Sequence, residues 1–328
     1  MKKFLFINAD RSLPQCAIFQ AGKVYADALR LCTEFELEYH EVGSEDIDGE
    51  IINLPSPYDH DAVIFNYQHV SSKIIPPVYI NSCPVAIGFL YEARQDPASS
   101  PLHFDDLLVG QVFDVIISPD PTLESSPRVW GTDRVIPRNV TSYTINNPYP
   151  VISTFGFPSP WKDLDTVVRM MCDEFKKATF RINYAPASHQ QGMAVGGVSF
   201  EVMAFEMIDS LRHLIRPGID ISYTSKYMTD SELISWLSES SLNVFMAKEE
   251  RGIQTGGALL ASVDVAIAAM KPILVSNNIE ARHLAGLYGD TLEYSMIHSP
   301  SSVRHYYQTW TAENFAAKID NLVRGYLC

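Results

Sequence analysis

The second half of the chain alternates between short apolar runs and longer segments with helical periodicity. Between residues 163 and 177 the apolar positions Val167, Val168, Met171, Cys172 and Phe175 fall on one face of a 3.6-residue repeat, which predicts a helix. Further helices are predicted over 199–215, from Thr229 onward and over 257–270. Strands are predicted for the apolar runs at 151–154, 179–182, 219–223, 243–246 and 272–275.

The first half follows the same alternation less regularly. Strands are predicted at 3–8, 62–66, 85–89, 114–118 and 134–136, and a helix at 24–35. Strands separated by helices indicate parallel sheets covered on both faces. We therefore predict an α/β protein of two Rossmann-like domains whose parallel sheets face each other across a cleft. The Asn- and Pro-rich stretch 139–150 is the predicted connector, with domains at 1–145 and 146–328.

The amino-acid composition and charge argue against several classes of function. The chain has 328 residues, 46% of them hydrophobic, and a formal charge of −14, so it can bury a sizeable core but lacks the basic surface that nucleic acid requires. No apolar run has the length of a membrane-spanning helix, and the first one stops at Asn8 and Asp10, which is too short for a signal peptide. Five scattered cysteines without C-x-x-C spacing fit a reducing compartment, so we expect a cytoplasmic protein.

A glycine-rich turn lies between the strand at 243–246 and the helix at 257–270. It contains Arg251, Gly252, Thr255, Gly256 and Gly257. Backbone N–H groups at such a turn, with the positive end of the helix dipole, suit a phosphate or a carboxylate. The alternative is that the glycines only form a tight turn. Neither G-x-G-x-x-G nor G-x-x-x-x-G-K-[ST] occurs, so a dehydrogenase or P-loop enzyme is not expected.

Two further loops follow predicted strands of the second half, at the sheet edge where α/β proteins bind ligands. Gly156 and Lys162 follow the strand at 151–154, and Lys162 is placed to reach an anion. The alternative for Lys162 is a solvated lysine beside Asp163 and Asp165. His189 follows the next strand, as a candidate ligand contact or an exposed loop residue.

Two candidate catalytic residues follow strands of the first half. His69 comes shortly after the apolar strand at 62–66, where a catalytic or substrate-contacting group, or a capping residue, would lie. Glu92 holds the same position after the strand at 85–89 and is a candidate general base, with a surface role as the alternative.

Several segments together resemble a known family. The stretch ISTFGFPSPWK at 152–162, the stretch DEFKKA at 173–178, Arg251-Gly252-Ile253 and AAMKPILV at 268–275 look like the nucleotide-sugar-binding domain of retaining, glycogen-synthase-like glycosyltransferases with the GT-B fold. The last stretch resembles the A-x-G-x-P-V-V segment of that family. In the first half, DAVIFNY at 61–67 and FDVIISPD at 113–120 are similar to the acceptor-side domain.

The resemblance implies functional roles for individual positions. Lys162 matches the lysine that binds the donor diphosphate, and residues 251–257 match the loop before the donor-side helix. His69 matches the acceptor-side histidine near the donor sugar. The implied donor is a nucleotide-sugar, the acceptor is a carbohydrate or a lipid-linked glycan, and neither a metal nor another cofactor is obligatory.

One family motif is missing. The Glu-x7-Glu pair that contacts the sugar and the donor ribose should fall at Gly257 and Val265, with Asp264 beside the second position. Met270 also replaces the glycine of the closing segment. Three functions remain: a divergent transferase that binds the nucleotide through backbone N–H groups, Thr255 and Asp264; a non-catalytic ligand- or partner-binding module; and a sugar-nucleotide epimerase. The transferase is favoured because Lys162, the glycine-rich turn and His69 follow strands at the expected edge.

Overall fold

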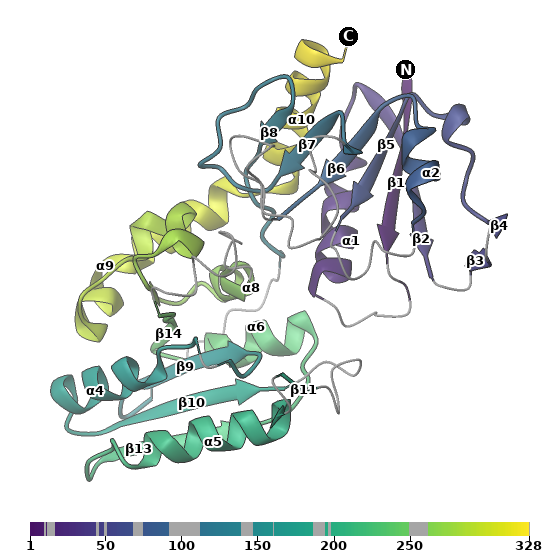
Figure 1. Cartoon of the computed structure of the whole chain (residues 1–328). Coiled ribbons are helices and arrows are strands. Elements are labelled where there is room, and N and C mark those ends of the chain that lie inside the picture. Colours follow the sequence, from purple (N-terminus) through teal and green to yellow (C-terminus); the bar gives the residue numbers. More distant parts are fainter. Residues whose placement is uncertain are drawn as a thin grey trace. The chain divides into compact units, whose positions relative to one another are not determined.

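The chain forms two compact units, each built on a parallel sheet (Figure 1). The computed structural model describes residues 1–9, 11, 17–43, 46–48, 51–67, 75–91, 112–138, 147–159, 161–185, 194–195, 198–248 and 262–327. Unit 1 comprises Met1–Val135 and Trp310–Cys328, and unit 2 comprises Ile136–Thr309. The prediction of an α/β protein with two Rossmann-like domains is confirmed.

Unit 1 has a six-stranded sheet in the order β2-β1-β5-β6-β7-β8, and every neighbouring pair is parallel. Its strands are β1 (Lys2–Ala9), β2 (Phe35–Val42), β5 (Ala62–Asn66), β6 (Ala86–Phe89), β7 (Val115–Ser118) and β8 (Val129–Gly131). Its helices are α1 (Ala17–Leu29), α2 (Pro77–Asn81), the short 3-10 helix η2 (Pro57–Asp59) and α10 (Ala312–Tyr326). A small antiparallel pair, β3 (Ile47–Asp48) and β4 (Ile51–Ile52), lies outside this sheet.

Both faces of the unit 1 sheet are apolar. Successive side chains of a strand point to opposite faces, so β1 sends Phe4 and Phe6 to one core cluster and Leu5 and Ile7 to another. The first cluster is completed by α1 and α10, and the second includes residues of α2. The sheet therefore needs helical cover on two sides.

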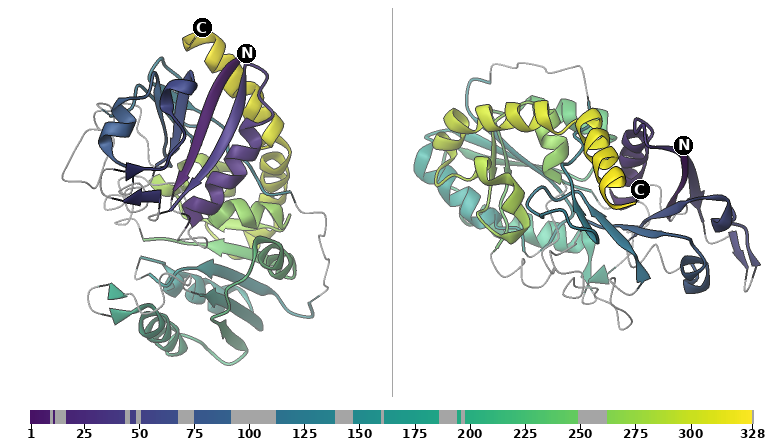
Figure 2. Two further views of the ribbon diagram at one scale, coloured as in Figure 1. Left: turned by 90° about the vertical axis from the view of Figure 1, so that its right-hand side faces the viewer. Right: turned by 90° about the horizontal axis from the view of Figure 1, so that it is seen from above.

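The last helix of the chain provides part of that cover. Phe315, Ile319 and Val323 of α10 are buried in the same cluster as Phe4 and Phe6. The Phe315 ring centroid lies 5.2 Å from that of Tyr25 on α1, and Figure 2 shows α10 (yellow) running alongside α1 (purple). The predicted boundary assigned this helix to residues 146–328, whereas it packs in unit 1 because its apolar face matches the uncovered side of that sheet.

A carboxylate on α10 also shapes the connection between α1 and β2. Asp320 is buried and accepts hydrogen bonds from the Thr33 N–H (2.8 Å), the Thr33 hydroxyl (2.8 Å) and the Glu34 N–H (3.1 Å). Arg324 pairs with Glu34 at 2.7 Å. The helix predicted at 24–35 therefore ends at Leu29, and the segment that begins at Phe35 is a strand.

The sixth strand differs from its predicted position. Residues 134–136 are not a strand, and β8 lies instead at Val129–Gly131, where it pairs with β7. Arg134 is buried and donates a hydrogen bond to the Pro119 carbonyl at 3.3 Å. This tertiary contact accounts for a buried charged residue that local periodicity does not predict.

Unit 2 has a five-stranded parallel sheet in the order β13-β10-β9-β14-β15. Its strands are β9 (Val151–Gly156), β10 (Ala178–Tyr184), β13 (Ile219–Thr224), β14 (Leu242–Phe245) and β15 (Ile273–Val275), with a separate short pair β11 (Ala194–Val195) and β12 (Val198–Ser199). Its helices are α4 (Leu164–Glu174), α5 (Phe200–Arg212), α6 (Asp230–Ser238), α8 (Ser262–Ala268), the 3-10 helix η6 (Ile279–Leu287) and α9 (Leu292–Thr309).

The helical periodicity of unit 2 matches its core. Val167, Val168 and Met171 of α4 are fully buried against Phe180 and Ile182 of β10. The predicted capping box is also present: the Thr229 hydroxyl accepts from the Glu232 N–H, and the Glu232 carboxylate accepts from the Thr229 N–H. None of the helices in the described part of the chain is both long enough and apolar enough to cross a bilayer.

Truncation of the α10 anchor tests its role in unit 1. We expect Phe315→Ala to lower the free energy of unfolding of unit 1 by about 3–5 kcal/mol, because it removes a fully buried aromatic side chain. Guanidinium unfolding of the full chain, followed by circular dichroism, measures the change. Asn321→Ala, at an exposed position of the same helix, is the control and should have little effect. Equal stability of the two variants would show that α10 does not support the core.

Candidate functional site

The carboxyl ends of the unit 2 strands lie at one edge of the sheet, because the strands are parallel. Gly156, the last residue of β9, is paired with Tyr184, the last residue of β10. The chain then leaves β9 through Lys162 and enters α4 at Leu164. Ligands of α/β proteins bind at such an edge, so it is the candidate site.

Lys162 is held at this edge by its side chain. Its ammonium donates a hydrogen bond to the Phe155 carbonyl at 3.2 Å. The same Nζ atom lies 5.3 Å from the centroid of the Tyr184 ring, within the range of a cation–π interaction. Two neighbouring strand ends therefore fix the position of one positive charge.

The backbone around Lys162 is tied to the segment that follows β14. Lys162 forms an antiparallel bridge with Ala247. The Asp163 N–H donates to the Met246 carbonyl at 3.1 Å, and the Lys248 N–H donates to the Trp161 carbonyl at 2.8 Å. The loop that carries Lys162 is thus anchored on both sides of the residue.

Ser276, just after β15, extends this anchoring to a third strand. Its hydroxyl accepts from the Ala247 N–H at 2.6 Å and lies 3.0 Å from the Ala247 carbonyl oxygen. The residues after β9, β14 and β15 therefore form one hydrogen-bonded edge.

Gly156 makes room for the lysine. Its φ of +125° is a conformation that residues with a side chain rarely adopt. A β-carbon built at this position would lie 3.2 Å from the Lys162 Nζ. Glycine thus serves both the turn and the close approach of the ammonium group.

Tyr184 was not a sequence candidate, although it supports Lys162. The side chain is fully buried, and burial raises the pKa of its phenol well above the ordinary value. The ring therefore stays neutral and offers its face to the ammonium. The only sequence signal was an aromatic residue two positions after a predicted strand, which is too common to identify a site.

The start of α4 adds to the positive character of this edge. Its first-turn N–H groups carry the positive end of the helix dipole, and Lys162 stands two residues before the first helical residue. Asp165 in the first turn opposes part of this charge. The arrangement suits an anion that accepts hydrogen bonds from N–H groups, such as a phosphate.

Asp264 lies in the first turn of α8, on the helix that follows β14. It is half-buried, between the fully buried Val263 and the half-buried Val265. The family resemblance places an acidic residue at position 265. This chain has Val265 there, and its apolar side chain is half-buried on α8. The structure describes α8 from Ser262 onward.

Several predicted site residues lie outside the described residues. They are His69, Glu92, His189, Arg251, Gly252, Thr255, Gly256 and Gly257. The strands before His69 and Glu92 are present as β5, which ends at Asn66, and β6, which ends at Phe89. Of the predicted residues that are described, the structure places the Lys162 ammonium close to Gly156. Within the described ranges, no three His, Cys, Asp or Glu side chains are grouped to bind one metal ion.

Polar residues at the matching edge of unit 1 have structural roles. The Asn66 amide donates to the Asn8 side-chain oxygen at 2.6 Å and to the Ile18 carbonyl at 2.9 Å. The Asn8 amide donates to the Phe19 carbonyl at 3.0 Å. These bonds fasten the start of α1 to the ends of β1 and β5.

Comparison with known proteins identifies the fold. No family model matches the sequence, and no curated protein matches it either. An O-GlcNAc transferase from Thermobaculum terrenum, in a mutant form, aligns with a TM-score of 0.60 and 10% identity over 99% of this chain and 67% of that one. Sucrose-phosphate synthase from Thermosynechococcus elongatus gives a TM-score of 0.60 and 10% identity, with 100% and 99% of the two chains covered.

A third similar structure is a complex with UDP-glucose. HepE from Anabaena in complex with UDP-glucose aligns with a TM-score of 0.54 and 12% identity, over 100% of this chain and 98% of that one. At this level of identity the similarity establishes the fold alone. The chain has the GT-B fold of these proteins, with two Rossmann-like domains that each contain a parallel sheet.

Proposed function

We propose that this protein is a glycosyltransferase that moves a sugar from a UDP-sugar donor to a carbohydrate or lipid-linked acceptor. The observation that carries the proposal is the Lys162 ammonium, held 3.2 Å from the Phe155 carbonyl at the carboxyl edge of β9. A fixed cation beside a helix N-terminus is suited to a diphosphate. Similar folds were solved with UDP-glucose in HepE and with UDP-2-fluoro glucose in an E. coli protein, which supports UDP as the nucleotide.

The proposed donor site extends from Lys162 to the start of α8. Lys162 and the first-turn N–H groups of α4 bind the diphosphate, while Gly156 lets the donor approach the backbone. Asp264 is proposed to contact the nucleoside. The glycine-rich turn contributes further donors to the phosphates, and its proposed members are Arg251, Gly252, Thr255, Gly256 and Gly257. His189 is proposed as a further ligand contact.

The proposed chemistry needs little beyond charge and position. The bond between the anomeric carbon and the phosphate oxygen breaks, and its electron pair leaves with the diphosphate. Lys162 and Arg251 neutralise that charge, so no metal ion is required. The acceptor hydroxyl oxygen bonds to the anomeric carbon with retention of configuration, and Glu92 is proposed to take its proton. His69 is proposed to orient the sugar on the acceptor side.

A second candidate is a non-catalytic module that binds a ligand or a protein partner. Val265 on α8 favours it, because an apolar side chain there cannot make the hydrogen bond that a carboxylate would make to a donor ribose. Under both candidates we propose a reducing, cytoplasmic setting, which is supported by the free thiols of Cys32, Cys83 and Cys172.

Ligand-dependent unfolding separates these candidates. The full chain is heated with UDP, GDP, ADP, CMP and their common sugar conjugates, and a ligand at about 100 times its dissociation constant should stabilise it by about 2.7 kcal/mol. A shift with UDP and its conjugates, followed by UDP release from one conjugate with an added glycan, supports the transferase. A shift without turnover supports the non-catalytic module. The absence of any shift contradicts the proposed donor site.

Removal of the lysine charge tests the diphosphate contact. We expect Lys162→Ala to weaken UDP binding about tenfold, or about 1.4 kcal/mol, because one charged donor is lost. Calorimetric titration measures the affinity, and the melting temperature of the unliganded protein should change little. Lys177→Ala is the matched control: this lysine also lies over an aromatic ring, Tyr149 at 4.1 Å, but directly precedes β10 at the opposite edge of the sheet. Equal UDP affinities of the two variants would show that Lys162 does not contact the nucleotide.

A methyl group at Gly156 tests the close approach of the lysine. We expect Gly156→Ala to cost about 1–3 kcal/mol of stability, because alanine disfavours a φ of +125°. We also expect weaker UDP binding, since the new β-carbon displaces the Lys162 ammonium. Scanning calorimetry and titration measure the two effects. Gly325→Ala, in α10 with nothing within 4 Å of the added β-carbon, should leave both values within error or slightly raise stability. A stable Gly156→Ala variant with unchanged affinity would contradict the geometry.

A further inference from the structure

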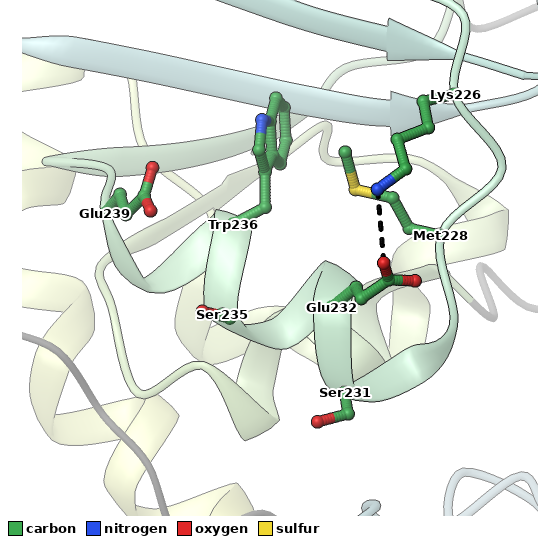
Figure 3. Close-up of a pocket in the computed structure, with 7 residues that line it drawn as sticks. All are labelled: Lys226, Met228, Ser231, Glu232, Ser235, Trp236 and Glu239. Carbon is green, nitrogen blue, oxygen red and sulfur yellow. Dashed lines mark hydrogen bonds and ion pairs between the residues drawn. The ribbon is translucent and has the colours of Figure 1, made fainter.

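An open pocket of about 370 Å³ lies in unit 2, between α6 and the segment after β13 (Figure 3). Its volume falls within the range of small-molecule sites, about 300–1,000 Å³. It is lined by Lys226, Met228, Ser231, Glu232, Ser235, Trp236 and Glu239. None of the residues assigned above to the donor site lines it.

Trp236 supplies an aromatic wall in a fixed position. Its side chain projects from α6 into the pocket, facing Lys226 and Met228 on the loop (Figure 3). The guanidinium carbon of Arg181 on β10 lies over one face of the Trp236 ring, 4.3 Å from its centroid. Arg181 also contacts the Trp236 carbonyl at 3.5 Å. The indole is therefore oriented before any ligand arrives.

The charges around the pocket cancel in pairs. Lys226 pairs with Glu232 at 3.1 Å, and Arg181 pairs with Glu239 at 3.1 Å. Glu232 also accepts hydrogen bonds from Thr229, and with Lys226 these lower the pKa of its carboxyl group. The Glu232 carboxylate thus stays ionised, and each of the two carboxylates is paired with a cation. Such a pocket selects neither a phosphate nor a free cation.

The remaining polar residues that line the pocket are Ser231, Glu232 and Ser235 of α6 and Glu239, which caps the C-terminus of this helix. Ser231 and Ser235 stand one turn apart, and Figure 3 shows Glu232 and Glu239 on either side of Trp236. Serine hydroxyls donate and accept, whereas carboxylates accept, so these groups match a ligand with many hydroxyls. The negative face of an indole attracts the weakly positive C–H bonds on one side of a pyranose ring.

We propose that this pocket binds a neutral saccharide, with one pyranose ring against Trp236 and its hydroxyls bonded to Ser235, Glu232 and Glu239. The proposal stands on the geometry of the pocket itself. Only the assignment of that saccharide to the acceptor glycan rests on the proposed transferase function.

Indole NMR signals report occupancy of the pocket directly. The chain contains four tryptophans, so the full-length protein labelled with 15N-tryptophan gives four indole N–H signals. The variants Trp236→Phe and Trp161→Phe assign the indole signals of these two residues, which report on the pocket and on the proposed donor site. Neutral oligosaccharides of glucose, galactose, mannose and N-acetylglucosamine are the probes. We expect at least one of them to move the Trp236 signal saturably while the other three signals stay in place.

Two variants and a control locate the binding. Trp236→Ala should weaken the binding at least tenfold by calorimetric titration. Ser235→Arg should weaken it by filling the pocket without removing the indole, which keeps the test decisive if Trp236→Ala is unstable. Tyr294→Ala is the control, because Tyr294 is an exposed aromatic residue on α9 that does not line the pocket. Its affinity should equal that of the unchanged protein.

The results that would contradict the saccharide pocket differ from those that would contradict the proposed donor site. The proposal fails if no neutral oligosaccharide moves the Trp236 signal, if only sialylated or phosphorylated sugars move it, or if Ser235→Arg binds normally. It also fails if UDP alone moves the Trp236 signal, which would assign the pocket to the nucleotide. UDP at the proposed donor site should instead move the signal of Trp161, the neighbour of Lys162. Loss of that response alone would contradict the donor site and leave the saccharide pocket intact.

Discussion

Unit 1 depends on the burial of both apolar faces of its parallel sheet by helices. Its strands alternate large apolar side chains, so exposure of either face would leave Phe4 and Phe6, or Leu5 and Ile7, in water. Residues 1–135 provide α1 and α2, and the rest of the first face is covered by α10 from the far end of the chain. Asp320 then ties the same helix to the turn between α1 and β2. The last helix is thus part of the domain that contains the first strand.

The same parallel arrangement gives unit 2 its candidate donor site. Because all strand ends face one edge, the residues after β9, β14 and β15 meet there although they are distant in sequence. Lys162 is fixed at that edge by the Phe155 carbonyl and the Tyr184 ring, and Gly156 leaves room for its ammonium. Folding already fixes the orientation of the Lys162 side chain. The positive charge is therefore in position before an anion binds.

The two proposed sites of unit 2 differ in their electrostatics. At the edge beside α4, a lysine and a helix N-terminus favour an anion. In the pocket beside α6, two cations are matched by two carboxylates, which leaves hydrogen bonding and the indole face to select the ligand. The proposed transferase function needs both kinds of recognition, because a nucleotide-sugar donor carries a charged diphosphate and a glycan acceptor carries many hydroxyls.

The sequence by itself determined the α/β class, most strands, the face of α4 and the capping box at Thr229, since these depend on periodicity and on contacts within one turn. It also placed Lys162 and Gly156 after the same strand. Only the tertiary structure decided where α1 ends, which segment forms β8 and that α10 belongs to unit 1. Tyr184 beneath Lys162 and Arg181 against Trp236 likewise join residues that are 22 and 55 positions apart. Such pairs depend on strand order and register, which a local pattern of residues does not encode.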